Sequence, residues 1–570
     1  MNAPPSPPAV APRSRAPFPV LGWLRGYSPS WFTGDMLAGI TLAAYAIPVA
    51  LAYAALAGLP PQLGIYGYML GGLGYALLGS SRHLAIGPTS AISLMVGASA
   101  ATISNGDAAM HAAVATLTAF TVAGICFVAW AARLSVLVKL ISDSVLVGFR
   151  FGAGLTISMT QLPSLFGVPG GGHDFFERVW TLLTQLGGFN PYALALGIVA
   201  IVLLVVGARK LPGKPVGLAV VVLSILVVSL FGLASHGVVV TGFIPPGLPE
   251  IGLPTMRVSE VENLFPLAAG CVLLAYIEGV SAARSFAEKH DYPINPRQEF
   301  LGLGAANLLA GLGHGYPVAG GLSQSAVNES AGAKTPLSLI LASATLALCL
   351  LFLTSLLANL PKAALAAIVL TAVAGLMNVP AMIRLFRVSR FDFIAASCAL
   401  AGVLFLGILQ GVLLAALASV LMLLRHGTRP LVAIIGRVPG TLHFGDLARH
   451  PDNERIPGTL IFRPEGPLTY LGVDEIQRVA LEAVAAAPEG SLHHVVCDLS
   501  TSPNADIAGL AMLRKLHEVL AAKGIALHIA EAHGRVRDLV RRDGLEPLFG
   551  EMDRAMALDA VITEIETRHP

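Results

Sequence analysis

The chain has 570 residues, of which 55% are hydrophobic and 12% are charged, and its mean hydropathy is +0.72. Soluble domains carry about twice that share of charged residues, so the composition excludes an ordinary soluble enzyme and predicts several membrane crossings. The net charge of +2 is the sum of two unlike parts. Residues 1–430 hold 22 Lys/Arg and 14 Asp/Glu, a net +8, whereas residues 431–570 hold 14 and 20, a net −6. We therefore expect a membrane domain followed by one acidic, soluble domain.

The first 28 residues are expected to form a disordered, mildly basic tail. Residues 1–20 contain seven prolines and two arginines but no apolar core, which excludes a cleaved signal peptide. The five cysteines of the chain form no C-x-x-C pair, and no His/Cys cluster has the spacing of metal ligands. We therefore predict no disulfide, no metal site and no cofactor other than a coupling ion.

Charge-free stretches mark the membrane spans between residues 29 and 430. The first stretch, residues 36–81, is 46 residues long and can hold two helices. Similar runs follow at 108–132, 179–208, 215–249, 335–361, 363–383 and 393–424. Because several of these runs contain Gly and Pro, each could form one helix with a fragment or two short helices. Hydropathy alone therefore predicts between ten and fourteen spans.

The charged links between the spans alternate in sign. Basic links lie at Arg133/Lys139, Arg209–Lys214, Arg284–Arg297, Arg384–Arg390 and Arg425/Arg429, and acidic residues lie in the links at Asp107, Asp174/Glu177 and Glu250–Glu262. Basic links stay on the cytosolic side of a membrane. We expect an even number of spans, both termini in the cytosol and a bacterial inner (plasma) membrane location.

Two segments of the membrane domain interrupt the apolar pattern in a related way. Residues 82–93 begin with an extended-looking stretch, continue with Gly87-Pro88 and end in a helical run that is too short to span. Residues 315–328 again combine an extended stretch, glycines and a short helix. Pro88 suits a first helical position and Ser323 suits an N-cap. The alternative is that both segments are Gly/Pro kinks that let helices pack closely.

Paired interrupted segments in two halves of a membrane protein indicate a transporter binding site. Unwound backbone is tolerated at membrane depth only where it is buried in protein or lines a cavity. The half-helix N-termini, expected at Gly87, Pro88, Gly321 and Leu322, would each present unpaired N–H groups and about half a positive charge. Together they would balance about one negative charge without any basic side chain. The pair therefore favours an anion as the ligand.

Several strings of residues in the membrane domain carry a family resemblance. They are Gly34-Asp35, Gly39-Ile40-Thr41, Ile47-Pro48, Ala52-Tyr53-Ala54, 56–61, Gly64-Ile65-Tyr66, Ser81-Arg82-His83, Ile86-Gly87-Pro88, 92–95, Ser323, Ala326-Val327-Asn328 and 332–336. These strings resemble the first-, third- and tenth-helix motifs of the sulfate permease (SulP) family, which includes pendrin and prestin. The resemblance implies a polytopic α-helical membrane protein with fourteen helices in two inverted seven-helix repeats, split into core and gate domains. It also implies a homodimer.

Residues 431–570 resemble a STAS domain, the small α/β module that usually follows SulP transporters. Strands are predicted at 495–499 and 526–530, with a helix that opens at Asp506. In bacterial signalling members a serine directly after this aspartate is phosphorylated, but here Ile507 follows it. We therefore expect a scaffold or dimerisation role for this domain, or binding of a cytosolic partner, and no phosphorylation switch at this loop.

Three positions depart from the family pattern around the implied site. Val49 stands where many relatives have glutamine, Thr89 where many have an aromatic or acidic residue, and Gln324 where several have arginine. The missing arginine removes a fork-shaped charge that suits oxyanions. Because the two helix ends alone balance only about half the charge of sulfate, bicarbonate and C4-dicarboxylate compete with sulfate as the expected anion.

The resemblance and the charge argument together define the expected anion site. We expect Tyr53, Thr89, Ser90, Ser323 and Gln324, with adjacent backbone N–H groups, to bind the anion.

Glu278 is the residue that we expect to bind the coupling cation. It follows the charge-free run Asn263–Ile277 and matches an acidic position of helix eight in several bacterial SulP members. An ionisable residue within a span is costly and marks an ion or proton path. We expect Glu278 to take up H⁺ or Na⁺. The alternative is a glutamate near the cytosolic end of the helix, paired with Arg284.

Three further residues of the membrane domain admit two interpretations each. Arg150 could supply the charge that Gln324 lacks, but pairing with Asp143 and snorkelling to the cytosol is the favoured interpretation. His314 could relay protons, although a hydrogen-bonded loop histidine is favoured. Tyr45 lies eight residues before Tyr53 and so on nearly the same helix face, where both could line the site or pack.

The function expected from the sequence is secondary active transport of a small anion (bicarbonate, sulfate or dicarboxylate) by H⁺- or Na⁺-coupled symport with alternating access. The alternatives are an anion exchanger, a channel-like anion conductor, or an anion-sensing receptor that signals through the STAS domain. No nucleophile–base pair or phosphate loop is found in the sequence, so an enzyme is not expected, and no nucleic-acid partner is expected. The expected partners are the anion, the lipid bilayer and a second copy of the chain.

Overall fold

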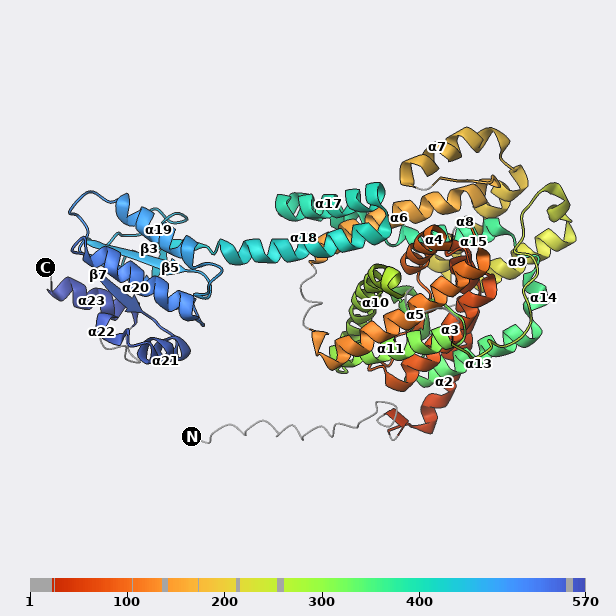
Figure 1. The fold of residues 1–570 in the computed structure, drawn as a ribbon, viewed down its shortest axis with the longest axis horizontal. Coiled ribbons are helices and arrows are strands. Elements are labelled where there is room, and N and C mark those ends of the chain that lie inside the picture. Colours follow the sequence, from red (N-terminus) through yellow and green to blue (C-terminus); the bar gives the residue numbers. More distant parts are fainter. Residues whose placement is uncertain are drawn as a thin grey trace. The chain divides into compact units, whose positions relative to one another are not determined.

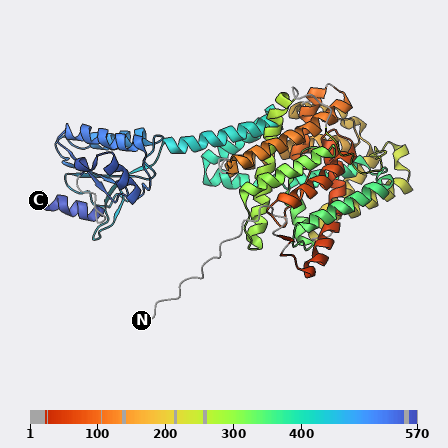
Figure 2. The same cartoon turned by 60° about the horizontal axis from the view of Figure 1, so that its bottom comes forward.

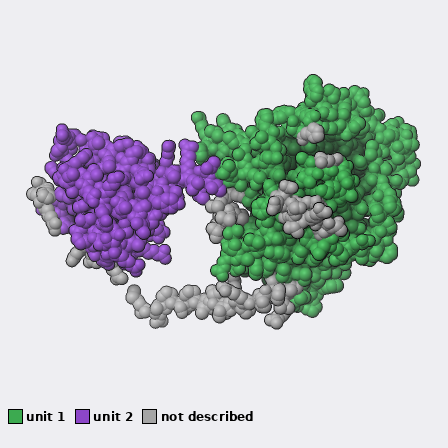
Figure 3. All heavy atoms as spheres, viewed as in Figure 1, with its two compact units in different colours: residues 1–419 green, residues 420–570 purple. Residues whose placement is uncertain are grey.

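The computed structural model describes residues 23–24, 26–104, 106–135, 142–172, 174–211, 216–253, 261–549 and 557–568. Most of the tail predicted for residues 1–28 lies outside these residues. The chain divides into two compact units, residues 1–419 and 420–570 (Figure 3). The first unit is helical, and the second combines a sheet with helices, as the sequence predicts.

The first unit is built of helices of different lengths, the last of which, α18, continues past Ser419 (Figures 1 and 2). Their bounds are α2 Phe32–Leu56, α3 Pro61–Leu78, α4 Ser90–Ser104, α5 Ala108–Ala131, α6 Asp143–Phe166, α7 Phe175–Gln185, α8 Pro191–Lys210, α9 Val216–Leu230, α10 Val261–Lys289, α11 Pro296–Leu312, α12 Leu322–Ser330, α13 Leu337–Phe352, α14 Thr354–Leu357, α15 Lys362–Ala374, α16 Val379–Val388, α17 Arg390–Leu406 and α18 Ile408–Thr428. Within the described residues, seven helical segments are long and apolar enough to cross a membrane, and three shorter helices are also apolar. The count of fourteen spans stays a prediction.

Polar residues at the ends of the apolar runs start several of these helices. The Asp107 carboxylate accepts hydrogen bonds from the first N–H groups of α5. Asn190 and Asn295 do the same for α8 and α11, and each is followed by a proline, whose missing N–H is not needed there. The helix boundaries are therefore encoded locally, by caps that satisfy N–H groups which the helix itself cannot pair.

The helices pack as two groups with matching contacts. In the first group, α11 packs against α3 and α5, and α13 packs against α3. The contact of α2 with α13 corresponds to the contact of α10 with α5, if α2 is taken as the equivalent of α10 and α13 as the equivalent of α5. In the second group, α6 packs against α15 and α17, and α8 packs against α15. This pairing relates the first half of the helices to the second half, as expected for two repeats.

The two interrupted segments meet in a short antiparallel ladder. Strand β1 (Ile86–Gly87) pairs with β2 (Ala319–Gly320), with Ile86 opposite Gly320 and Gly87 opposite Ala319. A Cβ on Gly87 would overlap the ring of Tyr68, so only glycine fits this position. The ladder confirms the predicted extended stretches, and it leads each strand directly into a short helix.

Asp35 fastens the segment that follows α12 to helix α2. Its buried carboxylate accepts hydrogen bonds from the N–H groups of Lys334 (2.6 Å) and Thr335 (3.0 Å) and from the Thr335 hydroxyl (2.7 Å). The first-helix string at Gly34-Asp35 and the string at residues 332–336 are therefore parts of one contact. A buried carboxylate is stable here because three donors replace its water.

The second unit contains a five-stranded sheet with helices on both faces. The strands are β3 Val432–Arg437, β4 Phe444–Asp446, β5 Thr459–Pro464, β6 His494–Asp498 and β7 Ala526–Ala530, in the order β4-β3-β5-β6-β7. The pairs β5–β6 and β6–β7 are parallel, and the remaining pairs are antiparallel. The larger core lies against α19 (Val473–Ala485), α20 (Ile507–Ala521) and α21 (Gly534–Arg542), and the smaller core lies against α23 (Leu558–Arg568).

Candidate functional site

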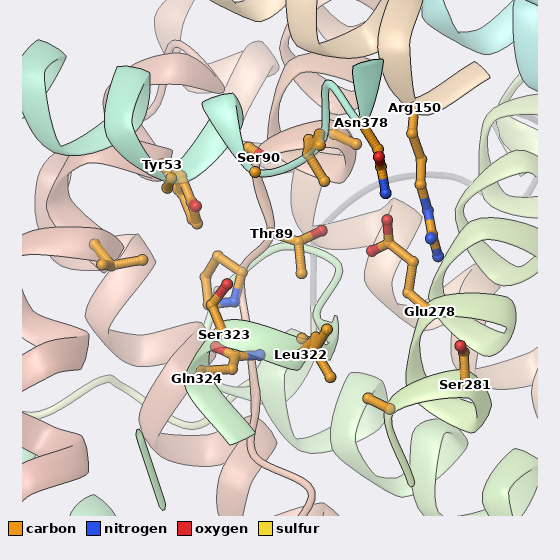
Figure 4. Close-up of a pocket in the computed structure, with 18 of the residues that line it drawn as sticks. Tyr53, Thr89, Ser90, Arg150, Glu278, Ser281, Leu322, Ser323, Gln324 and Asn378 are labelled. Atoms are coloured by element: carbon orange, nitrogen blue, oxygen red, sulfur yellow. The ribbon is translucent and has the colours of Figure 1, made fainter. Parts of the chain in front are cut away.

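A cavity of about 420 Å³ lies where the short helices α4 and α12 begin. Figure 4 shows its side chains. The lining residues are Tyr45, Val49, Tyr53, Pro88, Thr89, Ser90, Ala91, Val147, Arg150, Glu278, Ser281, Ala282, Gly321, Leu322, Ser323, Gln324, Ala372, Gly375, Leu376 and Asn378. All five residues expected to bind the anion are among them, together with Glu278. The structure therefore brings the predicted residues to one place, and their roles stay predictions.

The first turns of α4 and α12 both face this cavity. The first intrahelical hydrogen bonds run from the Ser93 N–H to the Thr89 carbonyl (2.9 Å) and from the Ser325 N–H to the Gly321 carbonyl (3.1 Å). The N–H groups at residues 90–92 and 322–324 precede these bonds and have no partner within their helices. Each helix end also contributes about half a positive charge.

Three predictions about these helix starts are wrong. Gly87 and Pro88 do not form the N-terminus of α4, because Gly87 belongs to strand β1 and the helix begins at Ser90. Ser323 is not the N-cap of α12, since Gly321 occupies the cap position and no side chain caps it. The ladder holds Gly87 extended, so α4 can begin only beyond it, whereas α12 begins at Leu322, one residue before Ser323.

Thr89 offers a hydrogen-bonding group that no protein atom uses. Its hydroxyl oxygen is buried and has no hydrogen-bond partner. In Figure 4 its side chain projects into the space between Ser323 and Glu278. A buried polar atom without a partner costs free energy unless a ligand or water pairs with it. Thr89 therefore suits an anion held at the middle of the cavity.

Gln324 ties the two interrupted segments together. Its amide Nε2 donates to the carbonyls of Ala85 (3.0 Å) and Ala319 (3.1 Å). The neighbouring Ser325 hydroxyl accepts a hydrogen bond from the Ala85 N–H (2.9 Å). The side-chain nitrogen of Gln324 is thus occupied by backbone, which an arginine at this position could not reproduce with the same geometry.

Arg150 and Glu278 face one another across the cavity (Figure 4). Arg150 comes from α6 and Glu278 from α10, and no ion pair within 4.0 Å joins them in the described part of the chain. The favoured interpretation of Arg150, a pair with Asp143 outside the site, is therefore wrong, because its side chain turns into the cavity. Among the described residues, no ion pair within 4.0 Å joins Glu278 to Arg284 either.

Sequence reasoning missed two further polar lining residues, Ser281 and Asn378. Ser281 follows Glu278 by three residues and so lies on the same face of α10, a signal that was present in the sequence. Asn378 caps α16 by accepting from the Ala381 N–H (3.0 Å), and nothing in its sequence context indicates the cavity. Tyr45 lines the cavity, whereas His314 does not; its carbonyl accepts a hydrogen bond from Thr116.

Comparison with protein families identifies both units. A model described as "Sulfate permease family" matches residues 32–399. The chain belongs to the sulfate permease family. A STAS domain model matches residues 450–557. The chain is therefore a multi-pass membrane protein of an anion transporter family, with a C-terminal STAS domain, and it is not an enzyme.

Relatives and solved structures agree with this assignment. A probable sulfate transporter of Mycobacterium tuberculosis is 34% identical over 553 residues, which cover 96% of this chain and 99% of that one. High affinity sulfate transporter 1 of Stylosanthes hamata is 29% identical over 94% of this chain and 84% of its own. The murine anion transporter Slc26a9 in its inward-facing state has a TM-score of 0.85 at 22% identity, over 96% of this chain and 94% of that one. The transmembrane domain of the cyanobacterial bicarbonate transporter BicA has a TM-score of 0.59 at 22% identity, over 69% of this chain and 98% of that one.

Proposed function

We propose that this member of the family is a proton-coupled secondary active transporter whose first candidate substrate is sulfate. The observation that carries the proposal is that Arg150 and Glu278 face one another in the cavity where α4 and α12 begin. The cavity combines fixed positive charge with one carboxyl group that can gain or lose a proton.

The charge of the site depends on the protonation state of Glu278. The two helix ends supply about +1 together and Arg150 supplies +1, so the site carries about +1 while Glu278 is ionised. Protonation of the Glu278 carboxylate raises the sum to about +2, which balances a divalent anion. Binding of sulfate and uptake of a proton therefore favour one another, and that reciprocity is the basis of symport.

Arg150 also changes the choice of anion. The sequence argument against sulfate rested on the absence of an arginine at Gln324, and Arg150 supplies that charge from another helix. Relatives at 34% and 29% identity carry the name of sulfate transporters, which supports the same substrate. The Thr89 hydroxyl, which has no protein partner, and the N–H groups of the two helix ends can donate hydrogen bonds to an oxyanion.

The experiment that tests the proposal is sulfate uptake into proteoliposomes with pH and Na⁺ gradients imposed separately. We expect wild-type uptake to be saturable and to rise when the side of entry is acidified. Glu278→Gln mimics the protonated carboxyl, so this variant should still exchange sulfate but should not accumulate it in response to a pH gradient. Glu288→Gln, at an exposed position on the same helix, is the matched control and should behave as wild type.

Three outcomes would contradict the proposal. Unchanged pH dependence in Glu278→Gln would remove the coupling role of this residue. Uptake driven by Na⁺ and indifferent to pH would replace the proton by sodium. Non-saturable flux that follows only the membrane potential would favour a channel.

We further propose that both termini lie in the cytosol of a bacterial cell. The support is the alternation of basic and acidic links along the membrane domain. On this orientation the anion cavity lies near the cytosolic links, since Ser281 is three residues before Arg284 and Asn378 is six residues before Arg384. Reporter fusions after Thr428 test the topology; activity of a periplasm-dependent reporter there would contradict it.

A further inference from the structure

A second cavity, of about 440 Å³, lies further along the helices that line the first one. On α6 the lining passes from Arg150 in the first cavity to Gln161 in the second. On α15 it passes from Ala372 to Lys362, against the chain direction. These steps are ten and eleven residues long, or about 15 Å along a helix. The two cavities are therefore stacked along the same helices.

Buried apolar side chains lie between the two cavities on three of the shared helices, α4, α6 and α15. Ile92 of α4, Ile157 of α6 and Val369 of α15 lie between the two sets of lining residues in sequence, and all three are fully buried. An apolar layer of this kind excludes water and ions. On these three helices an apolar layer therefore lies between the cavities, whereas on α2 the linings adjoin, with Tyr53 in the first cavity and Ala52 in the second.

The second cavity lies at the ends of the acidic links. His111 lines it four residues after Asp107, and Arg178 lines it four residues after Asp174. The first cavity lies beside the basic links instead. On the proposed orientation, the second cavity therefore opens toward the external side of the membrane.

The charge of the second cavity is entirely positive. Lys362 and Arg178 line it, and no Asp or Glu is among its described lining residues. The Lys362 side chain is exposed to the cavity, and its backbone N–H is anchored on the Val239 carbonyl (2.9 Å). The Arg178 Nε donates to the Gly172 carbonyl (3.1 Å), which fixes this side chain at the edge of the cavity. His111 is held by a contact between its Nε2 and the Ala57 carbonyl (2.8 Å).

Two carboxylates on α7 stand near Arg178 without lining this cavity. Asp174 and Glu177 are both exposed, and the Asp174 carboxylate accepts from the Glu177 N–H at the start of the helix. These carboxylates weaken the positive potential that Arg178 produces in the cavity. They do not weaken that of Lys362, which comes from another helix. The first cavity differs, because there Arg150 is opposed by Glu278 inside the same space.

We propose that the second cavity is an external anion site, in which Lys362 and Arg178 hold a small inorganic anion before it reaches the transport site. The inference rests on the proposed function, and adds to it a second binding site on the path of the anion. A cleft with one sign of charge and low-dielectric walls concentrates the opposite ion and raises its rate of association. The external site thus raises the local anion concentration where the carrier opens outward.

The first test measures sulfate uptake from the external side for Lys362→Gln. We expect KM to rise two- to tenfold at low ionic strength with little change in kcat, and the difference to shrink above about 0.5 M salt, where screening is strong. Lys362→Arg should keep the wild-type KM. Arg384→Gln, which removes an exposed charge from α16, is the control for loss of net charge. An unchanged KM, or a rise that salt does not reduce, would overturn the external site.

The second test needs no transport, so it separates this inference from the proposed function. Lys362→Cys is prepared together with Cys398→Ser, which removes the exposed native thiol. We expect a negatively charged methanethiosulfonate to modify Lys362→Cys several-fold faster than a positively charged one, and sulfate to slow it. Adding Arg178→Gln should abolish the preference. Equal rates for the two reagents would refute the site even if sulfate transport is confirmed.

Discussion

Replacing Arg150 by glutamine should change the charge selectivity of the transporter. For an effective dielectric constant of about 20 and a separation of about 6 Å between the guanidinium and the anion, Coulomb's law gives ~3 kcal/mol for each unit of anion charge. A divalent anion therefore loses about 3 kcal/mol more than a monovalent one when the guanidinium is removed. Since each 1.4 kcal/mol is a factor of ten, the ratio of kcat/KM for sulfate to that for bicarbonate should fall about 100-fold.

The assay is uptake of both anions into proteoliposomes at a fixed pH gradient. Arg150→Lys keeps the charge but loses the fork-shaped hydrogen-bonding geometry, so it should retain more of the sulfate preference than Arg150→Gln. Arg150→Gln combined with Glu278→Gln restores neutrality of the pair and should recover part of the sulfate exchange measured without a pH gradient. Equal losses for the divalent and monovalent anions would refute the charge argument, because a purely structural role for Arg150 would lower both together.

Three other predictions concern stability and reactivity. Asp35→Ala leaves three donors unpaired in the segment after α12, so we expect a loss of about 2–4 kcal/mol and a lower thermal midpoint in detergent; an unchanged midpoint would show that water replaces the carboxylate. Gly148→Val would overlap the backbone of α17 and should lower the yield of folded protein, whereas Gly124→Ala, with nothing within 4 Å, should not; equal yields would mean that α6 and α17 can separate without cost. Burial raises the pKa of the Cys497 thiol well above its usual range, so at pH 8 iodoacetamide should leave Cys497 unmodified in the native chain and modify it after unfolding. Modification of Cys497 before unfolding, read by mass spectrometry, would contradict its burial.

The interrupted segments could be predicted from the sequence because their signals are local. Glycine and proline within an apolar run already exclude a continuous helix, and the short runs that follow are confirmed as α4 and α12. The positions at which these helices start could not be predicted as well. Strand pairing between Gly87 and Ala319 joins residues more than two hundred positions apart, and a local capping rule cannot foresee where this pairing ends and the helix begins.

The orientation of Arg150 could not be predicted either. Asp143 and Arg150 are seven residues apart and so share a face of α6, but they are separated by about 10 Å along its axis. Which partner the guanidinium approaches depends on the neighbouring helix, and α10 places Glu278 opposite it. Likewise, no pattern within α2 shows that Asp35 would be paired by the segment at residues 332–336. The sequence supplied the candidates, and tertiary packing decided between them.

The β1–β2 ladder has a mechanical consequence. Gln324 links β1 to α12, and Gly320 packs closely against Gly279, the residue after Glu278. The starts of α4 and α12 and the segment of α10 that carries Glu278 are therefore joined by direct contacts into one cradle. Arg150 belongs to the group of α6, α15 and α17, outside that cradle. On the proposed mechanism, sliding of one group against the other would move the bound anion and proton together and would change their distance from the Arg150 guanidinium.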